Sequence, residues 1–161
     1  MNPEAQAPVV HSKRRGISPT MRTLNFLRER NLMVAVTEKW NPHARIRQDL
    51  FGFIDLIYAG GLDGIVGVQA TDDTSVSKRL AKAMSFEPTP RPGGKKPLPP
   101  CGPRLKTWLA SGGRFFVIGW GLRGARGMVK RWRPRIVWVK LKDGELVAVE
   151  QDAPATLFET R

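Results

Sequence analysis

Acidic side chains are scarce in this chain of 161 residues, which has 14 Asp and Glu against 27 Lys and Arg. The scarcity is greatest between Arg104 and Lys142, a segment with eleven Lys or Arg and no acid. The formal net charge is +13, and a balance this basic calls for a polyanionic partner. A nucleic acid is the expected partner because tryptophans are interleaved with the basic residues. An anionic membrane or an acidic protein is the alternative.

Cysteine is almost absent too, since Cys101 is the single one. No internal disulfide can form, and a reducing compartment, the cytoplasm, is expected. No His/Asp partner motif accompanies Cys101, which argues against a thiol nucleophile. No apolar run approaches the roughly 18 residues that a membrane-spanning helix requires. Residues 1–17 lack the apolar core of a signal peptide.

Hydrophobic residues nevertheless make up 41% of the chain, enough for a single folded domain. We expect this domain over residues 18–150, between a flexible basic tail (1–17) and a C-terminal tail (151–161). Residues 87–103 contain seven prolines and three glycines and predict an extended insertion loop. Helices are expected over 19–30, 75–84 and 104–113, and strands over 32–40, 49–59, 64–71, 114–120, 135–141 and 145–150. This order predicts an α/β fold in which a mixed β-sheet is flanked by helices and ends in a C-terminal β-hairpin.

Polar groups interrupt or end two neighbouring apolar runs, DLFGFIDLIYA and GIVGVQAT. On a strand alternate residues share a face, so Asp49 and Asp55 have one parity, as do Gln69 and Thr71 on the next strand. A carboxylate and polar oxygens from adjacent strands would converge on a hard divalent ion, Mg²⁺ or Mn²⁺. Glu38, at the end of the preceding strand, would add a second carboxylate. Such an ion activates water and polarises a phosphate, which phosphodiester hydrolysis requires.

Structural readings of the same residues remain open. Gln69 and Thr71 also fit the end of an ordinary strand, and Asp49 fits a solvated strand start. Asp55 is costly to bury as a charge unless it is paired or bound to a metal, and Arg45 or Arg47 would pair with it.

The same segments resemble a known family. EKWNPHARIRQDLFGFIDLI, followed by GVQAT and SVSKRLAKA, is similar to small phage and prophage proteins of the PD-(D/E)XK nuclease superfamily. This superfamily has the restriction-endonuclease-like fold and includes the archaeal Holliday junction resolvases. The resemblance covers roughly residues 18–120, apart from the proline-rich insertion. It implies a Mg²⁺-dependent hydrolase, a DNA endonuclease encoded by a phage or prophage and located in the bacterial host cytoplasm. A role on branched DNA would imply a homodimer, because two symmetric cuts need two sites.

Residue by residue, the resemblance matches Asp55 to the metal-binding aspartate, Gln69 to the second acid and Thr71 to the motif lysine. Glu38 matches an acid that some members supply from the first helix or strand, and Asp49 is a further metal-ligand candidate. Gln69 offers a neutral oxygen in place of a carboxylate, and Thr71 cannot stabilise developing negative charge as an ammonium can. Related families move the lysine to a neighbouring element, and the candidates here are Lys39, Lys78 and Arg79. If none of them reaches the site, the alternative is a catalytically inactive nucleic-acid-binding protein with the nuclease fold.

A basic, glycine-rich loop is expected over residues 121–132. GLRGARG (121–127) lacks a following Gly-Lys-Ser/Thr, which argues against a nucleotide-binding loop. The loop suits contacts to a nucleic-acid backbone that do not read its sequence. The backbone-contacting residues expected from this loop and from the segment 41–48 are Arg45, Arg47, Arg123, Arg126, Lys130, Arg131 and Arg133.

Overall fold

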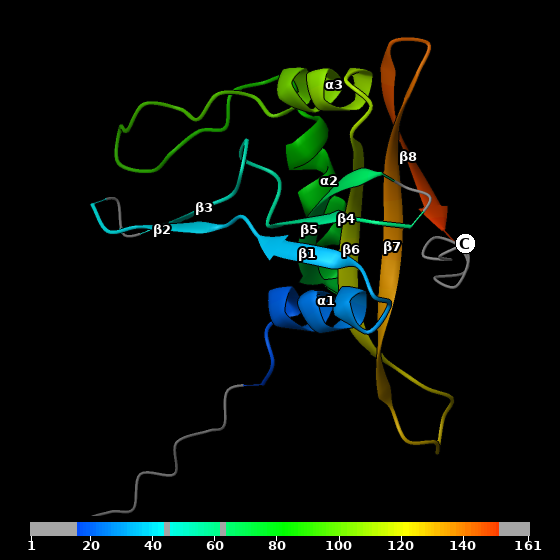
Figure 1. Cartoon of the computed structure of the whole chain (residues 1–161). Helices are drawn as coiled ribbons and strands as arrows, with labels where there is room; N and C mark the ends of the chain where they lie inside the picture. Colours follow the sequence, from blue (N-terminus) through cyan, green and yellow to red (C-terminus); the bar gives the residue numbers. More distant parts are fainter. Residues whose placement is uncertain (1–15, 44–45, 62–63, 152–161) are drawn as a thin grey trace, which may run out of the picture.

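The computed structural model describes residues 16–43, 46–61 and 64–151, without the side chains of residues 46 and 47 (Figure 1). A mixed six-stranded sheet with the order β1-β4-β5-β6-β7-β8 forms its centre. These strands are β1 (Met33–Val36), β4 (Leu56–Ala59), β5 (Ile65–Asp72), β6 (Arg114–Arg123), β7 (Arg131–Lys142) and β8 (Glu145–Gln151). Among the described strands of this sheet, β5 and β6 form the one parallel pair. All other neighbouring strands of the sheet pair antiparallel. The predicted α/β fold, a mixed sheet flanked by helices with a C-terminal hairpin, is confirmed. The two expected tails lie almost wholly outside the described residues.

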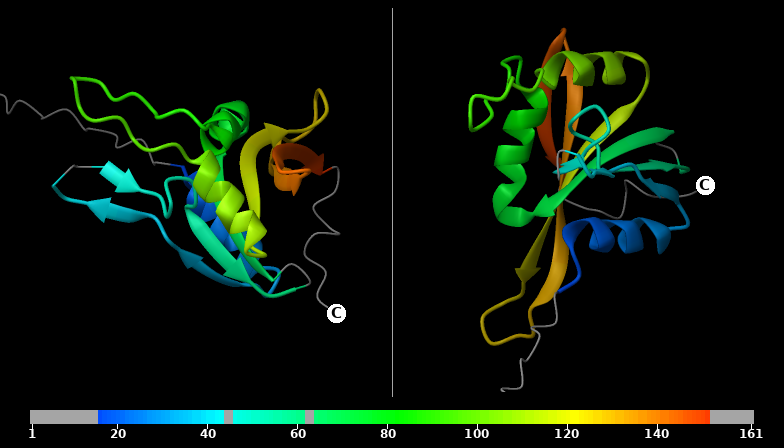
Figure 2. Two further views of the ribbon diagram at one scale, coloured as in Figure 1. Left: turned by 90° about the horizontal axis from the view of Figure 1, so that it is seen from above. Right: turned by 90° about the vertical axis from the view of Figure 1, so that its left-hand side faces the viewer.

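Helices cover both faces of the sheet (Figure 2). α1 (Pro19–Arg28) packs with one apolar cluster, which contains Leu27 together with Tyr58 of β4 and Phe116 of β6. The 3-10 helix η1 (Asp73–Ser75) leads into α2 (Val76–Met84), and α3 (Gly102–Ala110) follows the proline-rich segment. α2 and α3 pack with a second cluster that contains Phe115 and Val117 of β6. Alternate residues of β6 therefore face the two opposite helical layers.

A side chain caps the start of α1. The Ser18 hydroxyl accepts a hydrogen bond from the Met21 amide at 3.3 Å, and Pro19 occupies the first helical turn. A proline fits there because the first amides of a helix have no intrahelical partner. The cap fixes where the chain enters the helix, and this places Pro19 and Thr20 at the rim of the depression described below.

The predicted strand over residues 49–59 is wrong in its first half. β4 contains residues 56–59 alone, and Leu50 to Ile54 form a tight turn closed by the bridge Leu50↔Ile54. Phe51 and Gly52 have φ values of 56° and 85° in this turn, the left-handed region that strands exclude. The shared strand parity of Asp49 and Asp55 therefore does not exist.

Two further boundaries differ from the predicted ones. The expected strand 32–40 divides into β1 and β2 (Lys39–Asn41), and β2 pairs with β3 (Ile46–Gln48) in a separate ribbon outside the six-stranded sheet. The expected loop over 121–132 consists partly of strand, because β6 continues to Arg123 and β7 begins at Arg131. The proline-rich segment contains the single bridge Thr89↔Leu98 among its described residues and extends as a long loop (Figure 1).

Candidate functional site

Asp55 is held at the junction of three strands. It lies one residue before β4, and its amide donates to the Val68 carbonyl of β5 at 2.9 Å. Its own carbonyl accepts from the amides of Thr37 and Glu38 at 2.8 and 3.2 Å. These bonds link β5 to the segment between β1 and β2, so the backbone around Asp55 is fixed from both sides.

The Asp55 side chain is 5% exposed, and two donors of β5 hold one of its oxygens. Oδ2 accepts from the Ala70 amide at 2.9 Å and from Gln69 Nε2 at 2.5 Å. Gln69 thus presents its amide nitrogen to Asp55, whereas its carbonyl oxygen was the atom expected to bind a metal. A backbone and a side-chain donor together fix the direction of the Asp55 carboxyl group.

The predicted site residues meet in one depression of about 220 Å³. Glu38, Asp49, Asp55, Gln69 and Thr71 all line it, although they come from three separate segments of the chain. Thr71 is 4% exposed and Gln69 is 2% exposed. The remaining lining residues are Pro19, Thr20, Ala70, Asp72 and Arg79.

The carboxyl groups in the depression perturb one another. Burial is the main cause that raises the pKa of Asp55 from the ordinary 3.8 to about 7. The charge of Asp49, a hydrogen bond between the Asp49 and Asp55 side chains, and the charge of Glu38 raise this pKa further, whereas the Ala70 amide opposes the rise. Neighbouring carboxyl groups disfavour each other's ionisation, and a proton or a cation between them relieves the repulsion.

Basic residues of α2 border the site on one side. Lys82 Nζ lies 3.5 Å from Asp49 Oδ2. Arg79 lines both the site and a neighbouring depression along α2. Lys78 is exposed and lines only the neighbouring depression, not the site. Lys39 is exposed on β2. Of the three cations considered as substitutes for the motif lysine, Arg79 is the one that lines the depression with Asp55.

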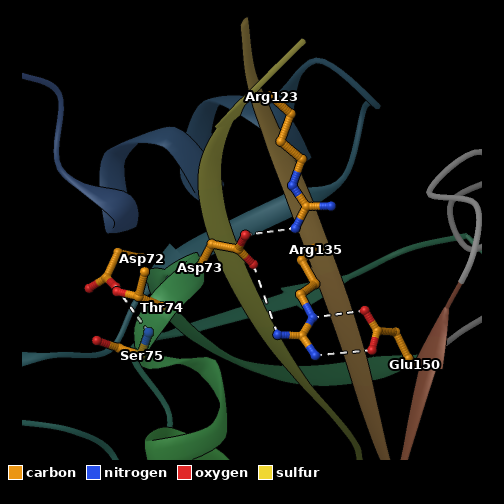
Figure 3. Close-up of polar contacts among 7 residues, drawn as sticks. All are labelled: Asp72, Asp73, Thr74, Ser75, Arg123, Arg135 and Glu150. Atoms are coloured by element: carbon orange, nitrogen blue, oxygen red, sulfur yellow. Dashed lines mark hydrogen bonds and ion pairs between the residues drawn. The ribbon is translucent and has the colours of Figure 1, made fainter. Parts of the chain in front are cut away.

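Asp72 lines the depression as well, although the sequence did not indicate a role for it. Asp72 Oδ1 accepts from Thr74 Oγ1 at 2.5 Å and from the Ser75 amide at 3.0 Å (Figure 3). The Thr74 bond is the main cause that lowers the pKa of Asp72. The signal available in the sequence is the acidic pair Asp72-Asp73 directly before the helix expected over 75–84, since acidic residues favour a helix start. It did not reveal that this start would adjoin the carboxyl pair.

Arg123, one of the residues expected to contact a nucleic-acid backbone, forms an ion pair within the protein. Its Nη2 lies 2.7 Å from Asp73 Oδ2, and Arg135 Nη1 lies 4.0 Å from Asp73 Oδ1. Arg135 also donates two hydrogen bonds to Glu150 at 2.7 and 3.0 Å. Figure 3 shows this chain of charges from η1 across β6 and β7 to β8. The network fastens the helix start that follows Asp72 to the far strands of the sheet.

The other predicted backbone-contacting residues fall into two groups. Those on the β6–β7 hairpin, Arg126, Lys130, Arg131 and Arg133, are all exposed. Arg45 lies outside the described residues, as does the side chain of Arg47.

Two carboxyl groups of the depression, those of Asp49 and Asp55, are suitable ligands for a hard divalent cation. Within residues 16–43, 46–61 and 64–151 no three His, Cys, Asp or Glu side chains are arranged to hold a metal ion. The pair Asp49 and Asp55 nevertheless matches Mg²⁺, which proteins commonly hold through one or two carboxylates together with water and substrate phosphates. A cation there would also offset the repulsion that raises the pKa of Asp55.

Comparison with known proteins gave no match, either to a family model, to a curated protein or to a solved structure. No helix in the described part of the chain is long and apolar enough to cross a membrane.

Proposed function

We propose that this protein is a metal-dependent DNA endonuclease that hydrolyses phosphodiester bonds. The observation that carries the proposal is the carboxyl pair of half-buried Asp49 and buried Asp55, which line one depression together with Glu38 and Arg79. The net charge of +13 favours a polyanionic substrate. The resemblance to PD-(D/E)XK nucleases supports the same reaction, because Asp55 corresponds to the metal-binding aspartate of their motif.

Asp49 and Asp55 would hold Mg²⁺ or Mn²⁺, which when bound supplies an activated water and polarises the scissile phosphate. Gln69 and the Ala70 amide orient Asp55 from behind, as hydrogen-bond donors behind a metal ligand commonly do. This gives Gln69 a positioning role in place of the direct ligand role that its motif position implied.

Arg79 is the group best placed to take over the charge-stabilising role of the motif lysine. It lines the site from α2, and a guanidinium offers several donors to the oxygens of a phosphate. Glu38 lies in the same depression and would accept a proton from the attacking water. Thr71 contributes a hydroxyl to the wall of the depression and carries no charge.

The direct test is cleavage of plasmid and branched DNA in Mg²⁺ or Mn²⁺ by the wild type and by Asp55→Ala and Asp49→Asn. We expect each variant to lose at least about 100-fold in rate, as losses of groups that organise charge at an active site commonly do. Asp143→Asn is the matched control, since Asp143 lies in the exposed β7–β8 turn with a φ of 51°, which Asn tolerates. Wild-type protein that binds DNA but cuts none of these substrates would contradict the proposal.

Metal binding provides a second measurement that does not depend on activity. We expect Mg²⁺ or Mn²⁺ to raise the melting temperature of the wild type at pH 8 and to have a smaller effect at pH 5, where Asp55, with its pKa of about 7, holds a proton. Asp49→Asn should abolish the difference. An equal shift in Asp49→Asn would place the ion elsewhere.

A specific observation favours a second function, a catalytically inactive nucleic-acid-binding protein. Lys82 pairs with Asp49 at 3.5 Å and thereby supplies a fixed positive charge beside the carboxyl pair. Gln69 and Thr71 stand where active relatives of the resembled family have an acid and a lysine. This alternative predicts salt-sensitive DNA binding that is the same in EDTA and in Mg²⁺.

A further inference from the structure

The β6–β7 hairpin continues beyond the sheet as a free two-stranded arm, which we define as residues 121–133. The last β5 residue paired with β6 is Asp72, opposite Trp120. Beyond this point β6 and β7 pair with each other alone, through Gly121↔Arg133, Leu122↔Trp132 and Arg123↔Arg131. Every residue from 122 to 133 is exposed. Figure 1 shows the arm extending past α1 at the lower end of the molecule.

The tip of the arm is apolar and its sides are basic. Met128 and Val129 are 69% and 83% exposed and are adjacent at the tip. The exposed cations beside and below them are Arg126, Lys130, Arg131 and Arg133. Because no acid occurs between residues 104 and 142, nothing on the arm opposes its attraction to an anion. Exposed apolar side chains surrounded by one sign of charge indicate a contact surface for a charged partner.

Contacts with η1 and α1 fix the orientation of the arm at its base. Arg123 pairs with Asp73 at 2.7 Å, and the Arg22 guanidinium of α1 lies 4.0 Å above the centre of the Trp132 ring. Gly121 permits the close approach of η1, because a Cβ atom at this position would lie 3.0 Å from Asp73 Oδ2. These contacts orient the arm before any partner binds, which lowers the entropic cost of binding.

The arm leaves the sheet at the end that also carries the candidate site. β5 and β6 are parallel, and Gln69, Thr71 and Asp72 occupy the last positions of β5 opposite Val117, Gly119 and Trp120. β6 then continues directly into the arm. A double-stranded nucleic acid that lies across the site would therefore extend toward the arm.

We propose that the arm inserts into a groove of double-stranded nucleic acid. Its cations contact phosphates on both sides of the groove, and Met128 and Val129 enter between neighbouring base pairs and unstack them. Architectural DNA-binding proteins insert apolar side chains into base steps in this manner, and two-stranded ribbons fit the grooves. Cations along the full length of the arm favour a groove over a membrane surface, which would engage the tip and its nearest charges. The inference rests on the nucleic-acid partner of the proposed function and is independent of cleavage.

The test uses duplex DNA containing the fluorescent base 2-aminopurine, in EDTA so that no cutting occurs. Binding of the wild type should raise the fluorescence severalfold through unstacking. The double variant Met128→Ser/Val129→Ser should abolish the rise, yet change the dissociation constant by less than about tenfold because phosphate contacts dominate affinity. Arg126→Ala/Lys130→Ala should weaken binding and reduce the slope of log K against log salt by about two. Met33→Ser is the matched control, since Met33 is 76% exposed on the edge strand β1.

Distinct results separate this inference from the proposed function. Binding with unchanged fluorescence, or a fluorescence rise retained by the Met128→Ser/Val129→Ser variant, would overturn the arm proposal. The arm proposal would also be overturned if the Met128→Ser/Val129→Ser variant no longer bound vesicles of phosphatidylserine and phosphatidylcholine, yet kept the wild-type fluorescence rise and dissociation constant with DNA. A normal fluorescence rise in a protein that never cuts DNA would refute the nuclease proposal and leave the arm proposal standing. Wild-type protein that binds no DNA would refute both.

Discussion

Asp55 owes its chemistry to competing local effects. Burial and the nearby Asp49 and Glu38 favour the neutral acid, whereas the Ala70 amide favours the carboxylate. The result is a carboxyl whose pKa of about 7 lies well above its ordinary 3.8. Its protonation therefore changes in the neutral range, where the protonation of a solvated aspartic acid is constant.

This shift predicts a pH dependence of stability. Between pH 4 and 7 the folded protein holds a proton at Asp55 that the unfolded chain has released, so the contribution of Asp55 to the free energy of unfolding falls as pH rises and becomes constant above about pH 8. The full fall is on the order of 4 kcal/mol, at about 1.4 kcal/mol per pKa unit. Urea unfolding in EDTA from pH 5 to pH 8 should show a flatter profile for Asp55→Asn than for the wild type. Parallel profiles would show that Asp55 does not titrate in this range.

The sequence predicted the buried polar residues of the site better than it predicted the reason for their proximity. Asp55 and Gln69 were identifiable because each interrupts an apolar run, where an unpaired polar group is costly. Their mutual hydrogen bond follows from the pairing of β4 with β5. Asp49 was expected to join them through strand parity, yet it reaches Asp55 through the turn at Leu50–Ile54. Arg79 and Asp72 depend on tertiary packing that periodicity does not encode.

At the scale of elements, the turn at Phe51-Gly52 shows where propensity misleads. DLFGFID is rich in strand-forming residues, and a left-handed Phe is uncommon enough that no sequence pattern announces it. Tertiary contacts stabilise it: Phe51 packs near Trp108 at a ring-centre distance of 6.2 Å, and the Cys101 thiol donates to the Gly52 carbonyl at 3.6 Å. Both partners lie about fifty residues away in the sequence.

The contact between β6 and the start of α2 predicts a stability effect. A Cβ atom on Gly119 would lie 2.2 Å from Val76 Cγ2 and 3.1 Å from Asp73 Cα. Val76 is fully buried and cannot rotate away, so Gly119→Ala should lower the free energy of unfolding by about 1–3 kcal/mol, as overpacking does. Chemical denaturation measures this loss. Gly16→Ala, with no atom within 4 Å of the added carbon, should leave stability nearly unchanged, and an equally stable Gly119→Ala would contradict the packing described.

At the scale of the whole molecule, the sequence alone showed that positive charge is concentrated in one segment of the chain. It did not show how this charge is distributed over the fold, because the expected glycine-rich loop proved to be a paired arm whose Arg123 is bound to Asp73. Glycine favoured a loop in the sequence, whereas Gly121 in the structure allows η1 to approach β6.

A role on branched DNA implies a homodimer, and this oligomeric state stays a prediction. Two symmetric cuts require two sites related by a twofold axis. Light scattering of the complex with a four-way junction should therefore give the mass of the junction plus two chains of 18.0 kDa each. A complex that contains one chain per junction would restrict the protein to single cuts.

The parallel pairing of β5 with β6 has a consequence for how the chain folds. Two antiparallel meanders make up the sheet: β1-β4-β5, with the β2-β3 ribbon inserted after β1, and β6-β7-β8. Their contacts are closer in the sequence than those between β5 and β6, so we expect them to form first. The pairing that joins them must await closure of the connection between Asp72 and Arg114, and such non-local contacts form slowly. The first meander supplies Asp55 and Gln69, and the second supplies the arm. Their relative placement is therefore acquired last in folding, and local opening between β5 and β6 would separate the two surfaces while leaving each meander intact.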